Sequence, residues 1–186
     1  MGKPRISDPS LLVIGVIYSH DYVVDTARQR LQKVVGNLRA VGEKQSFNWT
    51  QYYQKEMGEK LRRLFWVGEQ LVPRHFLADL KLITNQIEQE LAREDKSRTI
   101  NLDPGLLSAE NFVLATTKGY SHRIYLREGI YAEVTLICER GKLEPLRWTY
   151  PDYRSEDIRQ LLGGLRIDYI DQLRSSSYQV LKEVHK

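Results

Sequence analysis

The hydrophobic positions in the first half of the chain alternate between the periods typical of strands and of helices. Residues 11–17 form a nearly continuous aliphatic run, which is typical of a strand buried on both faces. Apolar residues then recur three or four positions apart over 24–35 and, after Pro73, over 76–91, as they do on one face of a helix. Alternating patterns predict three further strands, at 45–50, 61–67 and 98–102. The predicted order is β-α-β-β-α-β, which is that of a ferredoxin-like unit.

The second half of the chain is predicted to form hairpins. Asp103-Pro104-Gly105 fits a type II turn, and Ser108 is placed to cap a short helix that runs through Leu114. Two hairpin turns, Glu128-Gly129 and Arg140-Gly141, then separate three predicted strands, at 124–127, 130–139 and 142–148.

A last helix is predicted to begin at Ser155, because Glu156 and Asp157 would lie in its first turn, where the helix dipole favours acids. The patterns together predict one α+β domain over residues 1–186. Its ferredoxin-like βαββαβ core is extended by an antiparallel β-meander and closed by the C-terminal helix. The length agrees, since domains cluster near ~100–200 residues.

Composition narrows the class of protein. The chain is 41% hydrophobic and 28% charged, which is ordinary for a soluble globular protein. Its single cysteine, Cys138, excludes an internal disulfide, so a cytoplasmic location is expected. The apolar run 11–18 is too short to span a membrane, and no membrane association is expected. The net charge of +4 slightly favours anionic partners.

Side chains that could carry chemistry gather in three turn-rich segments, at 101–105, 116–123 and 149–155. Binding and catalytic groups are often found at such ends of elements. In the first segment, Asp103 has two interpretations. It could be part of a connector, with its carboxylate bonded to local backbone amides, or it could be a general base or a metal ligand.

The second segment contains the strongest catalytic candidate, His122, because imidazole titrates near physiological pH. Beside it, Lys118, Ser121 and Arg123 could hold a phosphate or a carboxylate, since arginine offers a bidentate fork and lysine a point charge. The alternative is a buried histidine that holds the loop by hydrogen bonds.

In the third segment, Tyr150 or Tyr153 could stack on a base, with Arg154 adding a positive charge. The alternative is an aromatic turn that packs over the meander. Glu133 lies opposite the apolar stripe of its predicted strand and is expected to be solvated. It would indicate a metal site only with a further carboxylate nearby.

These motifs resemble the domain-of-unknown-function family 4416, which comprises uncharacterised proteins of bacteria and archaea of similar length. The resemblance covers nearly the whole chain, and its matching segments are 101–105, 114–118, 120–126, 129–136 and 148–155, with Tyr52-Tyr53 and Glu56-Met57-Gly58. Members are sometimes labelled GTP-binding. The sequence does not support that label, because it has no GxxxxGK(S/T) phosphate loop and Gly141-Lys142 is followed by Leu143.

Two functions are consistent with these residues, and neither identifies a cofactor. The first is an enzyme or binder acting on a phosphorylated or carboxylated metabolite or a nucleotide. Lys118 and Arg123 would fix the anion, His122 would act as acid or base, and Asp103 would orient it or bind a divalent cation. The alternative is a non-catalytic module for RNA or another polyanion, suggested by the pI of about 9.1 and by tyrosines and arginines interleaved over 120–154.

Overall fold

A computed structural model describes residues 2–50, 52–176 and 178–183. The strands are β1 (Ser10–Tyr18), β2 (Leu38–Ser46), β3 (Arg62–Val72), β4 (Ile100–Leu107), β5 (Asn111–Thr116), β6 (Arg123–Arg127), β7 (Ile130–Glu139) and β8 (Lys142–Pro145). The helices are α1 (Asp21–Val35), α2 (Gln54–Met57), α3 (Leu77–Glu90) and α4 (Glu156–Ser175), with a 3-10 turn, η1 (Arg74–Phe76), before α3. The prediction of an α+β protein is confirmed.

All eight strands belong to one antiparallel sheet, in the order β2-β3-β1-β4-β5-β7-β6, with β8 paired to β7. The first strand therefore lies beside the fourth. The more specific ferredoxin-like assignment stays a prediction, supported by the order β2-β3-β1-β4.

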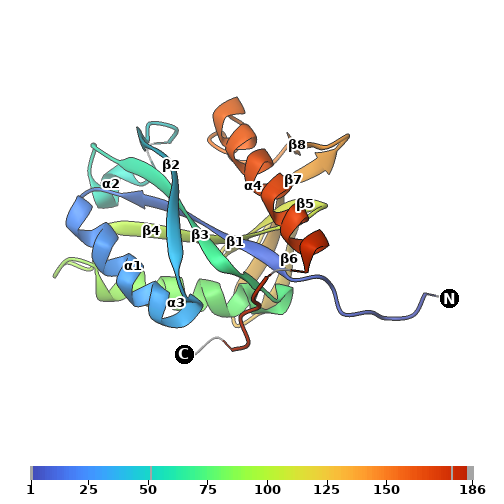
Figure 1. The fold of residues 1–186 in the computed structure, drawn as a ribbon. Coiled ribbons are helices and arrows are strands. Elements are labelled where there is room, and N and C mark those ends of the chain that lie inside the picture. Colours follow the sequence, from blue (N-terminus) through green and yellow to red (C-terminus); the bar gives the residue numbers. More distant parts are fainter. Residues whose placement is uncertain (1, 51, 177, 184–186) are drawn as a thin grey trace.

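Helices cover both faces of the sheet, α1 and α3 one face and α4 the other (Figure 1), and each face has its own core. Alternate β1 residues such as Leu12 and Ile14 point to the face covered by α1 and α3. The other β1 residues, such as Leu11 and Val13, point to the face covered by α4, where they pack against Leu162 of that helix. A smaller apolar cluster lies farther along this second face and contains Ile17, Phe47, Met57 and Leu61. Gly15 is the β1 residue between these two clusters, so the second face lacks a β1 side chain at that point.

Three predictions about the elements are wrong. β2 spans Leu38–Ser46 rather than 45–50. β4 continues through Asp103-Pro104-Gly105, so this segment is not a turn. The predicted helix through Leu114 does not form, because residues 111–116 form β5, which pairs with β4 and β7, and the Ser108 hydroxyl closes the turn by accepting hydrogen bonds from the amides of Glu110 and Asn111.

The two predicted hairpin turns are confirmed, with positive φ at Glu128, Gly129, Arg140 and Gly141. The final helix begins after Ser155, as predicted. Within the described part of the chain, no helix combines the length and the apolar character needed to cross a membrane.

Candidate functional site

A pocket of about 490 Å³ opens on the α4 side of the sheet, around Gly15. It lies where β4 and β5 separate. The two strands pair only over Gly105–Leu107, so the part of β4 before Pro104 has one edge that β5 does not cover. Asn101 and Asp103 line the pocket from that edge, and residues 114–118 line it from β5 and the loop after it.

Side chains of α3 satisfy the uncovered edge of β4. The Leu102 amide donates to Glu88 at 2.6 Å, and the Leu102 carbonyl accepts from Lys81 at 2.8 Å. Amides two residues apart point the same way in a strand, so the nitrogen of Pro104 also faces away from β1. A proline is tolerated in the strand there, since it removes no hydrogen bond to β1.

Lys81 of α3 and Asn101 of β4 hold the Asp103 carboxylate in place. One Asp103 oxygen accepts from Lys81 at 3.1 Å and the other from the Asn101 amide at 2.6 Å. Arg98 donates to Asn101 at 3.0 Å and lies 3.6 Å from Glu88. The predicted position of Asp103 at a strand end is therefore wrong, because it lies within β4, but its carboxylate does face a pocket.

A buried ion pair forms the opposite end of the pocket. Arg63 of β3 is paired with Asp152, which follows β8 in the chain, and both side chains are nearly inaccessible. The Arg63 guanidinium lies over the rings of Phe65 and Tyr153, 4.5 and 4.4 Å from their centroids. A Cβ atom at Gly15 would lie 2.7 Å from the Tyr153 hydroxyl, so glycine is needed for this close approach.

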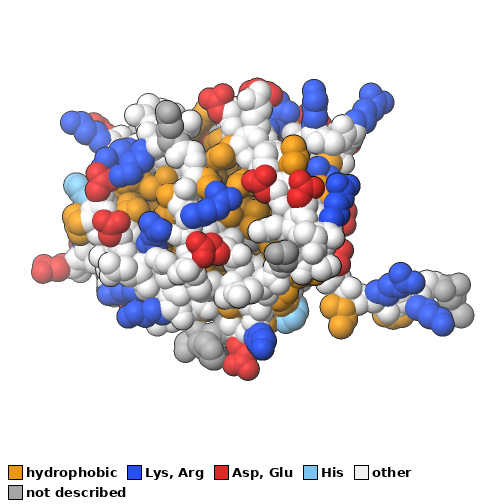
Figure 2. Space-filling model, viewed as in Figure 1, with side chains coloured by type: hydrophobic (Ala, Val, Ile, Leu, Met, Phe, Trp, Pro, Cys, Tyr) orange, Lys and Arg blue, Asp and Glu red, His pale blue; other side chains and the backbone are white. Residues whose placement is uncertain are grey.

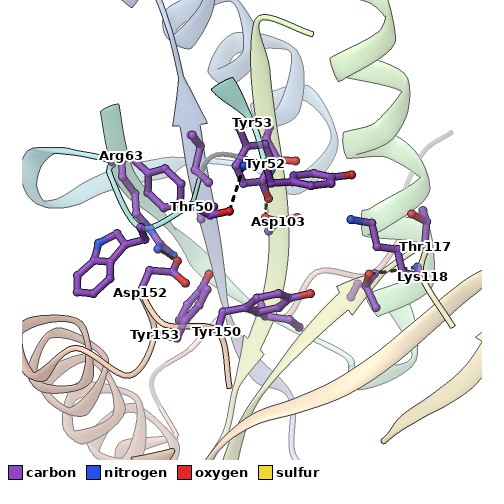
Figure 3. A pocket seen from close by; sticks show the side chains of 18 of the residues that line it. Thr50, Tyr52, Tyr53, Arg63, Asp103, Thr117, Lys118, Tyr150, Asp152 and Tyr153 are labelled. Atoms are coloured by element: carbon purple, nitrogen blue, oxygen red, sulfur yellow. Dashed lines mark hydrogen bonds and ion pairs between the residues drawn. The ribbon is translucent and has the colours of Figure 1, made fainter. Parts of the chain in front are cut away.

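Tyrosines form two facing walls. Figure 3 shows Tyr52 and Tyr53 on one side of the pocket and Tyr150 and Tyr153 on the other, with Asp103 between them. Burial raises the pKa of Tyr53 and of Tyr150, and it raises the pKa of Tyr153 to about 12. These three side chains therefore stay neutral at physiological pH.

Lys118 lies at the open side of the pocket. Its ammonium group is 4.0 Å from the centroid of the Tyr52 ring, and Thr117 lies next to it (Figure 3). The nearby ammonium lowers the pKa of Tyr52, in contrast to the other three tyrosines. No acidic group among the described residues forms an ion pair with Lys118.

We expect Tyr52 to ionise at a lower pH than Tyr53 and Tyr150, because Lys118 stabilises its phenolate. NMR titration of ring-labelled tyrosine, assigned with Tyr52→Phe, measures this difference. In Lys118→Gln the pKa of Tyr52 should rise toward the ordinary value of about 10. An unchanged Tyr52 titration in that variant would show that the two side chains are not in contact.

His122 does not line the pocket but is connected to it through Glu133. Its ring stacks on Trp148, and its Nε2 lies 3.1 Å from a Glu133 oxygen. Arg123 donates to the same Glu133 oxygen at 2.8 Å and to the Tyr150 hydroxyl at 2.6 Å. The two residues therefore lie behind the pocket wall and support Glu133 and Tyr150, both of which line the pocket.

The expectation that Glu133 is solvated is wrong, because only 1% of its surface is exposed. The pairing of β5 with β7 shifts between Phe112↔Leu136 and Val113↔Val134, so β7 has one extra residue. The extra residue shifts the alternation of side chains by one, so residues on the two sides of the bulge are out of phase in the faces to which they point. The apolar stripe of β7 therefore crosses from one face to the other, and Glu133 faces the pocket.

Of the other predicted binding residues, Tyr150, Tyr153 and Lys118 line the pocket, whereas Ser121 is exposed outside it. Arg154 donates to the carbonyls of Thr149, Leu146 and Arg147, so it holds the loop that carries the tyrosines.

The comparison with protein families shows which family the chain belongs to. Residues 8–169 match the model of a family described as "Domain of unknown function (DUF4416)". The chain belongs to this family. Comparison with curated proteins and with solved structures gave no match. The matched region, residues 8–169, contains every strand of the sheet and all the residues that line the pocket, which run from Gly15 to Tyr153.

Several residues that line the pocket were not predicted from the sequence. Lys81 and Glu88 interrupt the buried side of α3, and Arg63 alternates with Leu61 and Phe65 on a buried strand face. A charged residue in an otherwise apolar stripe of a helix or strand could have indicated these pocket residues, because charges are rarely buried without a partner.

Asp103, Asp152 and Glu133 all line the pocket, as a carboxylate metal site would require. Among the described residues, however, no group of three or more His, Cys, Asp or Glu side chains could hold a metal ion. Each of the three carboxylates instead has a basic partner.

Proposed function

We propose that the pocket binds a small, flat metabolite that carries a phosphate or a carboxylate, a class that includes nucleotides. The observation that supports this most directly is a lysine of the lining that has no carboxylate partner in the described part of the chain. Arg63, Lys81 and Arg98 each have a carboxylate partner, whereas Lys118 has none among the described residues. The lining as a whole is balanced, with four basic and four acidic side chains, but Lys118, at its open side, is the basic one that has no carboxylate partner within the residues described and so can pair with an anionic ligand.

The shape and chemistry of the walls support a flat ligand. The volume of about 490 Å³ lies within the usual range of ligand sites, roughly 300–1,000 Å³. Aromatic rings on opposite sides can stack on a planar group, each contributing on the order of 1–3 kcal/mol. Tyr52 and Tyr150 keep 55% and 39% of their surfaces exposed, so their rings are accessible.

In this proposal Lys118 binds the anionic group and the tyrosines hold the ring. Arg123 contributes indirectly, through the Tyr150 hydroxyl. A reaction in which His122 acts as acid or base stays a prediction, and any proton would have to pass through Glu133.

We expect Lys118→Gln to weaken binding of an anionic ligand about tenfold or more, because a hydrogen bond to a charged group contributes about 1.5–3 kcal/mol. Thermal unfolding in the presence of a panel of nucleotides and aromatic carboxylates measures the effect. The stability of the ligand-free protein should hardly change, since Lys118 is exposed.

The matched control is Lys142→Gln, which removes an exposed lysine of β8 outside the pocket. If both variants lose binding equally, Lys118 contributes only to the general charge of the surface and does not contact the ligand. If no member of the panel stabilises the wild-type protein, the proposal fails.

The alternative, RNA or polyanion binding, is supported by the exposed aromatic side chains of Trp49, Tyr52 and Tyr120. On the face shown in Figure 2, basic and acidic side chains are intermixed, which weakens the case for a continuous basic surface there. If the protein binds RNA or another polyanion, mixed RNA should be retained on a filter at low salt, and this retention should be lost at moderate salt. No retention at low salt would rule it out.

A further inference from the structure

We infer that Asp103 recognises the sugar hydroxyls of a ribonucleotide, so that the pocket prefers ribonucleotides to their 2′-deoxy counterparts. This inference rests on the proposed function and narrows its ligand class. It begins from the position of Asp103, which lies in the middle of the pocket between Tyr53 and Tyr150, with Lys118 to one side (Figure 3).

Asp103 is held rigidly but keeps acceptor capacity. A carboxylate offers about four lone-pair sites. Lys81 and Asn101 use one on each oxygen, at 3.1 and 2.6 Å. The side chain remains 29% exposed, unlike that of Lys81, which is 7% exposed. Two acceptor positions therefore stay open for donors on a ligand.

The charged neighbours of Asp103 make neutral hydrogen-bond donors on a ligand more favourable than cationic ones. Lys81 already compensates the carboxylate, and Glu88 lies 3.9 Å from the same ammonium group. A ligand ammonium group would have to be desolvated beside Lys81, which costs energy. Hydroxyl groups carry no such penalty, and a pair of neighbouring hydroxyls matches the two free acceptor positions.

The groups that line the pocket agree with those that would bind a nucleoside monophosphate. The tyrosine walls take a flat ring, Lys118 takes an anion at one side, and Asp103 lies between the two walls. In a nucleotide, the unit that joins the ring to the anion is a sugar with hydroxyl groups. A site built to accept hydrogen bonds from a ligand discriminates strongly against an analogue that lacks the donors.

The test is calorimetric titration of the wild-type protein with the four common ribonucleoside monophosphates and their 2′-deoxy counterparts. An aromatic carboxylate without a sugar, indole-3-carboxylate, is titrated in parallel. For at least one base, the ribonucleotide should bind about tenfold or more tightly than its deoxy partner, as expected for a lost hydrogen bond to a charged group. In Asp103→Asn this ratio should fall toward one, whereas Asp171→Asn on the exposed side of α4 should keep it.

The outcomes separate the two claims. Equal affinity for ribonucleotides and deoxyribonucleotides, or binding of indole-3-carboxylate without any nucleotide, would overturn the inference and leave the proposed function standing. Absence of binding by every compound would overturn both. Because the wild-type ratio needs no variant, the inference remains testable even if Asp103→Asn does not fold.

Discussion

Replacing Arg63 with alanine is expected to lower the free energy of unfolding by about 3–5 kcal/mol, as for other buried ion pairs that lose one partner. The change leaves the Asp152 carboxylate buried without its basic partner. It also removes the guanidinium that packs on the Phe65 and Tyr153 rings at the end of the pocket. Since domains are stable by only about 5–15 kcal/mol, urea denaturation should detect a large shift of the midpoint.

The control is the double variant Arg63→Met/Asp152→Leu, in which neither charge remains. Replacing both members of a buried pair by apolar residues of similar size is often close to neutral. The double variant should therefore recover most of the stability that Arg63→Ala loses. If the double variant is as unstable as Arg63→Ala, the loss of stability comes from packing rather than from the unpaired carboxylate.

Much of the fold could be predicted because it depends on local patterns. The helical spacing of Val24, Ala27 and Leu31 marks α1, and these side chains are indeed buried against the sheet. The two hairpins could be predicted from Glu128-Gly129 and Arg140-Gly141, since the turn conformation is decided within four residues.

The errors occur where distant residues decide the structure. Asp103-Pro104-Gly105 has the composition of a turn, yet it forms a strand because β1 pairs along its whole length and α3 side chains bond its other edge. Ser108 has a capping pattern that fits a helix as well as a tight turn. Only the pairing of β4 with β5 distinguishes the two.

The site could be predicted only in part, because some of its residues stand out locally and others are brought together by distant parts of the chain. Asp103, Lys118 and the tyrosines of 150–153 stand out in the sequence, and all of them line the pocket. The convergence of Arg63 on Asp152 is not visible locally, since these residues are 89 positions apart. The burial of Glu133 depends on a bulge whose presence is decided by the neighbouring strand.

Replacing Gly105 with alanine is expected to destabilise the protein by about 1–3 kcal/mol, the usual cost of overpacking a core. An added Cβ would lie 2.6 Å from Phe112 Cε2 and 3.0 Å from Leu114 Cδ2. Both neighbours belong to β5 and are buried in the core beneath α4, so neither can move freely. Because Gly105 is the residue at which β4 and β5 separate, the clash should also widen the pocket and weaken ligand binding.

The matched control is Gly164→Ala on the exposed side of α4, where an added Cβ meets no atom within 4 Å. Alanine is favoured over glycine within a helix by about 1 kcal/mol, so this variant should be more stable than the wild-type protein. The same substitution is thus expected to shift the urea midpoint in opposite directions at two glycines of one chain. If Gly105→Ala were as stable as Gly164→Ala, β4 and β5 could not be packed as closely as the structure shows. The separation of these strands would then no longer account for the pocket.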